Sequence, residues 1–171
     1  SYYTPKILSD FLTKHIIQKY LKYDDTLSVL EPSCGDGEFV SSLFDSLDLK
    51  DIQKVNIDLL DIDNKELKKA KSLIPQSNQI KAKTFCQDYL KFFLEGKKKY
   101  SLIIGNPPYI KKENLKKEQI DKCQEVNSRI KEYSTKVKSK GTIKNIWPAF
   151  IEAAVMSLDK QGVLCFVIPA E

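Results

Sequence analysis

Short apolar runs with the composition of β-strands alternate with segments of helical periodicity along most of this chain. The strand-like runs are bounded by turn residues and lie at positions 26–31, 54–60, 79–85, 100–104 and 163–168. Apolar residues recur every three or four positions in the segments 5–23, 38–47, 66–73 and 146–158. Alternating strands and helices are typical of a parallel sheet with helices on both faces. We therefore expect an α/β fold with a doubly wound, mainly parallel sheet in a single domain of 171 residues.

The most distinctive loop follows the fourth strand, where Asn106, Pro107, Pro108 and Tyr109 come soon after the apolar run 100–104. Each proline lacks an N–H and restricts the residue before it to an extended conformation, so neither helix nor sheet can continue. Asn106 and Pro107 should therefore be extended just beyond the carboxyl end of a strand. Open α/β sheets bind their ligands at this edge.

This loop has a specific chemical use. The side-chain carbonyl of Asn106 and the main-chain carbonyl of Pro107 can accept two hydrogen bonds from one planar NH2 group, whose lone pair then becomes available to attack a methyl sulfonium. Tyr109 offers a face on which a planar ring can stack, worth about 1–3 kcal/mol for a base. The alternative is a rigid turn with a surface tyrosine, but the full tetrapeptide after a strand favours the functional interpretation. No catalytic base is needed, because the amine loses its proton only after methyl transfer.

A second candidate site lies after the first strand, in a loop with Gly35 and Gly37. These glycines permit positive φ and close approach of a ligand, but the third glycine of the dinucleotide fingerprint is missing, which argues against NAD and FAD. Glu31 ends the first strand and can accept from loop amides or from a cationic methionine moiety. Asp61 ends the second strand and can accept both ribose hydroxyls, or is simply an exposed turn carboxylate. Asp88 follows the third strand and can accept from an adenine amine.

The order of these motifs resembles that of the γ-class N6-adenine-specific DNA methyltransferases of restriction–modification systems. The tetrapeptide 106–109 resembles their motif IV. Further matches are residues 3–5 with motif X, 31–39 with motif I, 61–63 with motif II, 88–89 with motif III, and 147–169 with the next helix and strand. The resemblance implies a Rossmann-like S-adenosylmethionine-dependent methyltransferase fold. It also implies methyl transfer from S-adenosylmethionine to the exocyclic N6 amine of an adenine flipped out of double-stranded DNA.

The resemblance assigns roles residue by residue. The clamp for the target amine consists of Asn106, Pro107 and Tyr109. The residues expected to contact the cofactor are Tyr3, Thr4, Pro5, Glu31, Ser33, Cys34, Gly35, Asp61, Ile62, Asp88, Tyr89 and Asn106. Motif II usually has Glu where Asp61 stands, so the reach to the ribose is shorter here.

The expected organisation has four parts: a motif X helix in 1–25, the cofactor and catalytic core in 26–110, a basic loop or helical segment in 111–145, and a helix with the fifth strand in 146–171. Thr4 is expected to cap the first helix, and Gln161 and Gly162 to form the turn that ends the last helix. The family's remaining sheet strands and its target recognition domain have no counterpart before the end of the chain. We therefore expect a truncated catalytic domain that is inactive alone, with a recognition domain and a nuclease as fused or separate partners.

Charge, cysteine content and hydropathy bear on the partner, on metal binding and on the location of the protein. Residues 111–144 contain eleven Lys or Arg and five Asp or Glu, as expected for a segment that borders double-stranded DNA, although a solvated lysine-rich helix face has the same composition. The four cysteines are scattered and His15 is the single histidine, so a zinc site is not expected. No apolar run reaches the ~18 residues that span a membrane and no signal segment opens the chain, so we expect a cytoplasmic protein.

Three other functions are compatible with the tetrapeptide. Glutamine N5-methylation of a release factor uses the same four residues, but those enzymes usually have a helical domain before motif I and a motif I richer in glycine. Methylation of an exocyclic amine in RNA is a second alternative. The third is a non-catalytic, cofactor-binding fragment that acts as a scaffold.

Overall fold

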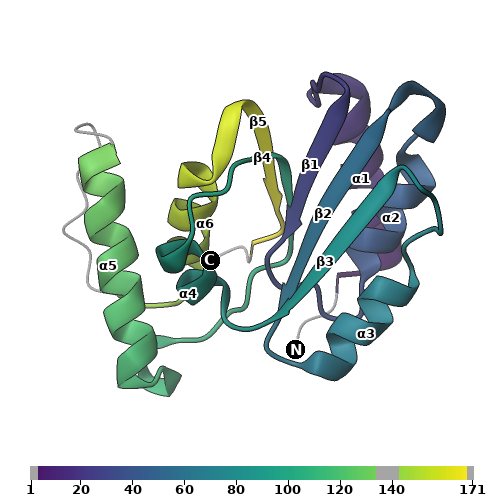
Figure 1. Ribbon diagram of the computed structural model, residues 1–171. Helices are drawn as coiled ribbons and strands as arrows, with labels where there is room; N and C mark the ends of the chain where they lie inside the picture. Colours follow the sequence, from purple (N-terminus) through teal and green to yellow (C-terminus); the bar gives the residue numbers. More distant parts are fainter. Residues whose placement is uncertain (1–3, 134–142, 169–171) are drawn as a thin grey trace.

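The computed structural model describes residues 4–133 and 143–168 (Figure 1). Within these residues one sheet contains five strands, with the bounds β1 (Thr26–Glu31), β2 (Lys54–Asp61), β3 (Ile80–Cys86), β4 (Tyr100–Gly105) and β5 (Leu158–Phe166). Their order across the sheet is β3-β2-β1-β4-β5, and every neighbouring pair is parallel. The predicted parallel α/β sheet is confirmed.

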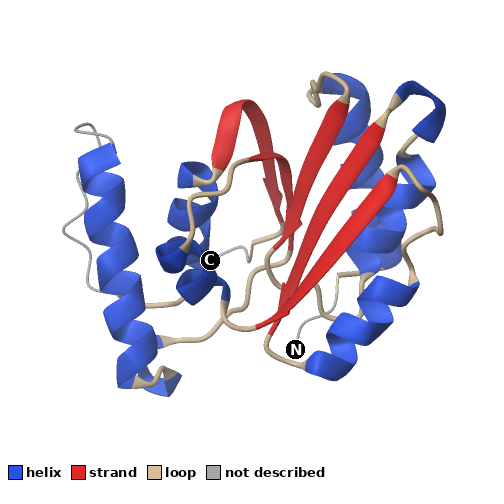
Figure 2. Ribbon diagram, viewed as in Figure 1, coloured by secondary structure: helices blue, strands red, loops and turns tan. Residues whose placement is uncertain are grey.

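Helices cover both faces of the sheet (Figure 2). One face carries α1 (Lys6–Lys19), α2 (Glu38–Ser46) and α3 (Asn64–Ser72). The other face carries α4 (Tyr89–Glu95), α5 (Lys117–Tyr133) and α6 (Trp147–Met156). Two short 3₁₀ helices, η1 (Leu49–Asp51) and η2 (Lys112–Asn114), lie in the connections. Across the described ranges, no helix combines the length and apolarity that a membrane span requires.

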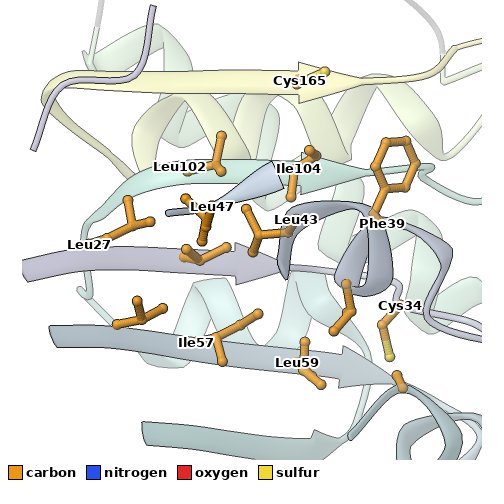
Figure 3. Packing of buried hydrophobic residues seen from close by; sticks show 14 of the residues in the cluster. Leu27, Cys34, Phe39, Leu43, Leu47, Ile57, Leu59, Leu102, Ile104 and Cys165 are labelled. Carbon is orange, nitrogen blue, oxygen red and sulfur yellow. The ribbon is translucent and has the colours of Figure 1, made fainter. Parts of the chain in front are cut away.

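The alternation of side chains along the strands produces two apolar layers. In β1, Leu27 and Val29 face α1, α2 and α3, whereas Leu30 faces the opposite helices. Figure 3 shows the first layer, in which Phe39 and Leu43 of α2 pack against side chains from the strands. Each fully buried side chain of this size contributes about 1.5–3 kcal/mol to folding. The two layers fix the carboxyl ends of the strands relative to one another.

A buried polar contact joins two strands that are not neighbours. The carboxylate of Asp58 in β2 accepts hydrogen bonds from the Tyr100 hydroxyl of β4 at 2.8 Å and from the Lys98 ammonium at 2.5 Å. Asp58 is 2% exposed, so it depends on these partners. Because β1 lies between β2 and β4, the contact ties the three strands together at the start of β4.

Three local predictions were wrong: two concern the ends of helix α1, and the third concerns Gly162. Helix α1 ends at Lys19 instead of near position 23, because the chain turns there: the Leu21 N–H bonds the carbonyl of Ile16, and Leu21 packs against the core. Pro5 is the N-cap residue of α1, with no side-chain cap bond, so Thr4 does not cap the helix. The side chain of Thr4 makes a tertiary contact instead, described below.

The segment around Gly162 also differs from the prediction. Helix α6 ends at Met156, and Gly162 lies inside β5 instead of in a turn that ends the helix. The pairing of β4 with β5 shifts register between Tyr100 and Leu102. A Cβ at position 162 would lie 2.7 Å from the Tyr100 carbonyl oxygen, so glycine permits this close approach of the two backbones.

Candidate active site

The candidate site lies where the order of the strands reverses. Strands β1 and β4 are neighbours, paired at Val29–Leu102 and Leu30–Ile103, although β2 and β3 separate them in the sequence. The chain leaves the carboxyl ends of β1 and β4 in opposite directions, which opens a crevice at this edge of the sheet. A cavity of about 580 Å³ occupies this position, a volume within the range of small-molecule sites.

The glycine loop forms one wall of the cavity. Its backbone turns through a bond from the Cys34 N–H to the Leu60 carbonyl and one from the Gly37 N–H to the Cys34 carbonyl. Gly37 has a φ of 92°, and a Cβ there would lie 2.8 Å from the Cα of Ala70 in α3. Gly35 has a φ of 50° and no atom within 4 Å of an added Cβ, so its surface is open to a ligand.

Asp61 holds the glycine loop against the end of β2. Its carboxylate accepts a hydrogen bond from the Gly35 N–H at 2.9 Å and another from the Asp63 N–H at 2.9 Å. A carboxylate has about four acceptor positions, so these two bonds leave capacity for ribose hydroxyls. Ile62, next in the sequence, is 78% exposed and lines the same cavity.

Asp88 has two structural roles at the end of β3. It caps α4 by accepting a hydrogen bond from the Lys91 N–H at 2.9 Å, and it faces the Lys122 ammonium of α5 at 3.6 Å. Lys122 also pairs with Glu118 at 2.7 Å. Tyr89, the next residue, is 2% exposed and packs against Phe150 of α6. Helices α5 and α6 therefore contact the residues predicted to bind adenine.

Glu31 is buried at the end of β1, between the glycine loop and the Asn106 loop. It is 2% exposed, and its carboxylate accepts a hydrogen bond from the Ser33 N–H at 3.3 Å. Burial raises the pKa of Glu31 well above its ordinary value, and the nearby Asp61 carboxylate raises it further. A buried carboxyl group with this little compensation is suited to a cationic ligand.

Replacing Glu31 with glutamine is expected to stabilise the protein at neutral pH. The raised pKa means that the folded state disfavours the ionised carboxyl group. The resulting loss of folding stability is absent below the unfolded pKa of about 4.5 and grows as the pH rises toward the folded pKa. We expect the free energy of unfolding of the variant to be about 1–2 kcal/mol higher at pH 7, or its Tm roughly 2–8 °C higher for a domain of this size. Thermal melts at pH 4.5 and pH 7 measure the difference.

The control for this prediction is Glu113→Gln, at an exposed position in η2, which should leave Tm unchanged at both pH values. A gain for Glu31→Gln that is equally large at pH 4.5 and pH 7 would contradict the argument from ionisation.

Hydroxyl groups from three parts of the chain bond to Asn106. The Asn106 Nδ2 donates to Oγ1 of Thr4 at 3.0 Å, and the Ser33 hydroxyl donates to the Asn106 main-chain carbonyl at 2.9 Å. The Tyr109 hydroxyl lies 2.6 Å from Asn106 Oδ1 and 2.5 Å from the Val167 carbonyl oxygen. Burial raises the pKa of Tyr109, so its hydroxyl keeps its proton. These contacts hold Asn106 at the wall of the cavity.

Most of the predicted site residues line this one cavity. The wall includes Thr4, Glu31, Ser33, Cys34, Gly35, Asp61, Ile62, Asp88, Tyr89, Asn106, Pro107 and Tyr109. Pro5 is exposed and does not belong to the wall, and Tyr3 lies outside the described residues. The cavity is also lined by residues that were not predicted from the sequence, among them Gln119 of α5 and Ile146 and Phe150 at α6. Nothing in the sequence near Gln119 or Ile146 marks a ligand contact, and the match of 147–169 with the family's helix and strand assigns no role to Phe150.

Comparisons with known proteins identify the fold and the family. The chain is 27% identical over 172 residues to the type II methyltransferase M.AccI of Acinetobacter calcoaceticus; the match covers 99% of the chain and 28% of that protein. Among solved structures, a Listeria monocytogenes protein assigned as a class I S-adenosylmethionine-dependent methyltransferase has a TM-score of 0.67 and 18% identity. The matched region covers 97% of this chain and 46% of the Listeria protein.

A second solved structure, the methyltransferase subunit of a type I restriction-modification system from Streptococcus thermophilus, has a TM-score of 0.65 and 14% identity over 96% of this chain and 34% of its own. The fold is therefore that of S-adenosylmethionine-dependent methyltransferases, as predicted. The family model described as Eco57I restriction-modification methylase matches residues 11–171. Because this match covers nearly the whole chain, the protein belongs to the Eco57I restriction-modification methylase family.

Proposed function

We propose that this protein transfers a methyl group from S-adenosylmethionine to the N6 amine of an adenine flipped out of double-stranded DNA, as part of a restriction–modification system. One observation carries the proposal. The Asn106–Tyr109 loop and the glycine loop line the same cavity, so a site for a methyl donor and a clamp for an amine open onto one another. Membership of a restriction-modification methylase family supports DNA as the substrate.

The residues of the cavity fit the proposed cofactor. Three carboxylates, of Glu31, Asp61 and Asp88, stand at the carboxyl ends of β1, β2 and β3 and line its wall. Glu31 would face the cationic methionine end, Asp61 the ribose hydroxyls and Asp88 the adenine amine. Bound S-adenosylmethionine supplies an electrophilic methyl group on a sulfonium. The open surface at Gly35 lets a ligand approach the backbone without steric conflict.

Residues of the Asn106 loop would orient the target amine. Asn106 Oδ1 and the Pro107 carbonyl would each accept one N–H of the amine, which directs its lone pair toward the methyl group. In this structure Asn106 Oδ1 accepts from the Tyr109 hydroxyl at 2.6 Å. The incoming amine would replace that donor, and the Tyr109 proton would then go to the Val167 carbonyl, which lies 2.5 Å away. The ring of Tyr109 would stack on the flipped base.

A basic surface continues from this loop. Lys111, Lys112, Lys116 and Lys117 are all exposed, and they follow Tyr109 by two to eight positions along the chain. Exposed lysines of this kind neutralise phosphates and make DNA affinity strongly dependent on salt. The residues 134–142, part of the predicted DNA-bordering segment, lie outside the described ranges. We infer that the described lysines contact the DNA backbone beside the flipped base.

One labelling experiment tests the proposed function. The protein, expressed at the full length of its gene, is incubated with methyl-labelled S-adenosylmethionine and a mixture of duplex DNA, structured RNA and release-factor protein. We expect the label in N6-methyladenine of the duplex and none with Asn106→Ala. Label in glutamine or in RNA would overturn the DNA assignment. Cofactor binding with no label transferred to any of the three would overturn catalysis and favour a scaffold.

A further inference from the structure

We propose that Thr4 is a positioning residue for methyl transfer, whose hydroxyl holds the amide of Asn106 in place while the target amine binds. The inference rests on the proposed function and adds a role for Thr4 beyond contact with the cofactor. Thr4 and Asn106 are 102 positions apart in the chain, yet Thr4 Oγ1 lies 3.0 Å from Asn106 Nδ2. Thr4 is 7% exposed, so water does not readily replace it as the partner of the amide.

The hydroxyl of Thr4 has no role in capping α1. A threonine just before a helix commonly accepts a hydrogen bond from the first helical N–H groups. Here Pro5 is the N-cap residue, and no side chain caps the helix. The described contact of the Thr4 hydroxyl is instead directed into the cavity, to Asn106.

The other contacts of Asn106 constrain different parts of the residue. Ser33 donates to its main-chain carbonyl and so fixes the backbone of the loop. The Tyr109 hydroxyl donates to Oδ1, the same oxygen that must accept a hydrogen bond from the target amine. The tyrosine contact therefore has to be exchanged during the reaction, whereas the Thr4 contact is on the nitrogen side of the amide and can persist. Thr4 can hold the side chain through the step in which Oδ1 changes its donor.

The same contact strengthens the clamp electronically. An amide whose N–H donates a hydrogen bond is polarised, which increases the negative charge on its oxygen and makes that oxygen a better acceptor. A donor bond from Nδ2 to Thr4 therefore favours the bond that Oδ1 makes with the target amine. Removal of the hydroxyl should weaken both the orientation and the acceptor strength of Asn106, with little effect on ground-state binding of the cofactor.

A pair of substitutions tests the proposal in the protein at the full length of its gene. Thr4→Val removes the hydroxyl at nearly constant volume, and Thr4→Ser retains it. We expect Thr4→Val to lower the single-turnover rate at saturating cofactor and DNA by about 10- to 100-fold. The Kd for S-adenosylhomocysteine should change by less than about 3-fold, because the hydroxyl acts through Asn106. Thr4→Ser should recover most of the lost rate.

Two results would overturn the inference. A weakened Kd with an unchanged single-turnover rate would make Thr4 a cofactor contact only, and equal losses for the valine and serine variants would make its role one of packing. Should Thr4→Val fail to fold, Thr4→Ala provides the same comparison with serine. Absence of N6-methyladenine from the unmodified protein is a separate result, which would remove the proposed function before any variant is compared.

Discussion

Replacing Asn106 with alanine is expected to lower the rate of methyl transfer by about 100- to 1,000-fold, the usual effect of removing one positioned hydrogen-bonding group from an active site. The amide oxygen is lost, so the target amine keeps only the Pro107 carbonyl as an acceptor and its lone pair is no longer directed. Affinity for the cofactor should change little, because Glu31, Asp61 and Asp88 remain at their strand ends. Single-turnover transfer and calorimetric binding of S-adenosylhomocysteine measure the two effects separately.

Asn114→Ala is the matched control, since Asn114 is an exposed asparagine in η2 on the same segment. It should retain the full rate. A full rate of methyl transfer by Asn106→Ala would contradict the proposal that Asn106 orients the target amine. Parallel losses of rate and cofactor affinity would indicate that Asn106 acts mainly by holding the cavity in shape.

Gly105→Ala is expected to destabilise the protein through a steric clash with the side chain of Glu31. A Cβ at this position would lie 2.2 Å from Oε1 of Glu31 and 2.9 Å from its Cδ, far inside van der Waals contact. Glu31 is 2% exposed, so its carboxyl group must shift within a packed environment, toward the cavity that it lines, to make room for the added methyl group. We expect the free energy of unfolding to fall by about 1–3 kcal/mol, or Tm by roughly 2–12 °C, measured by thermal or urea unfolding.

The cause of that loss can be tested by removing the opposing group. Gly105→Ala should cost much less when Glu31 is already alanine, because the added methyl then enters the space of the missing carboxyl group. Gly96→Ala is the control, since its Cβ would meet only the Phe92 carbonyl at 3.2 Å. An equal cost of Gly105→Ala in both backgrounds would show that the clash with the Glu31 carboxyl group is not the cause of the loss.

The strands were predictable from the sequence because each strand is encoded locally. Val55, Ile57 and Leu59 are buried in β2 on one face, and a period of two in the sequence reveals them. Most of the predicted site residues come together for a related reason. Glu31, Asp61 and Asn106 stand at or just beyond the carboxyl ends of strands, and parallel strands place those ends at one edge.

Two of the errors arose where a polar or small residue serves a tertiary contact. Thr4 precedes a proline and a helix, so its sequence neighbourhood indicates a cap, yet its hydroxyl bonds Asn106. Gly162 follows a helical pattern and suggests a turn, yet it accommodates the Tyr100 carbonyl. The same limit hid Gln119 and Phe150, whose contribution to the cavity depends on how α5 and α6 pack and not on their neighbours in the sequence.

The hydrogen bonds of the Asn106 loop also have a consequence for the order of folding. The bonds from Thr4, Ser33 and Val167 to this loop join residues 102, 73 and 58 positions apart. Contacts this distant in the chain must overcome a large loop-closure entropy and form slowly compared with local helices. The loop therefore acquires its geometry only after both halves of the sheet have assembled. In a refolding experiment, the return of methyl transfer should report the last event of folding, later than the recovery of helical signal.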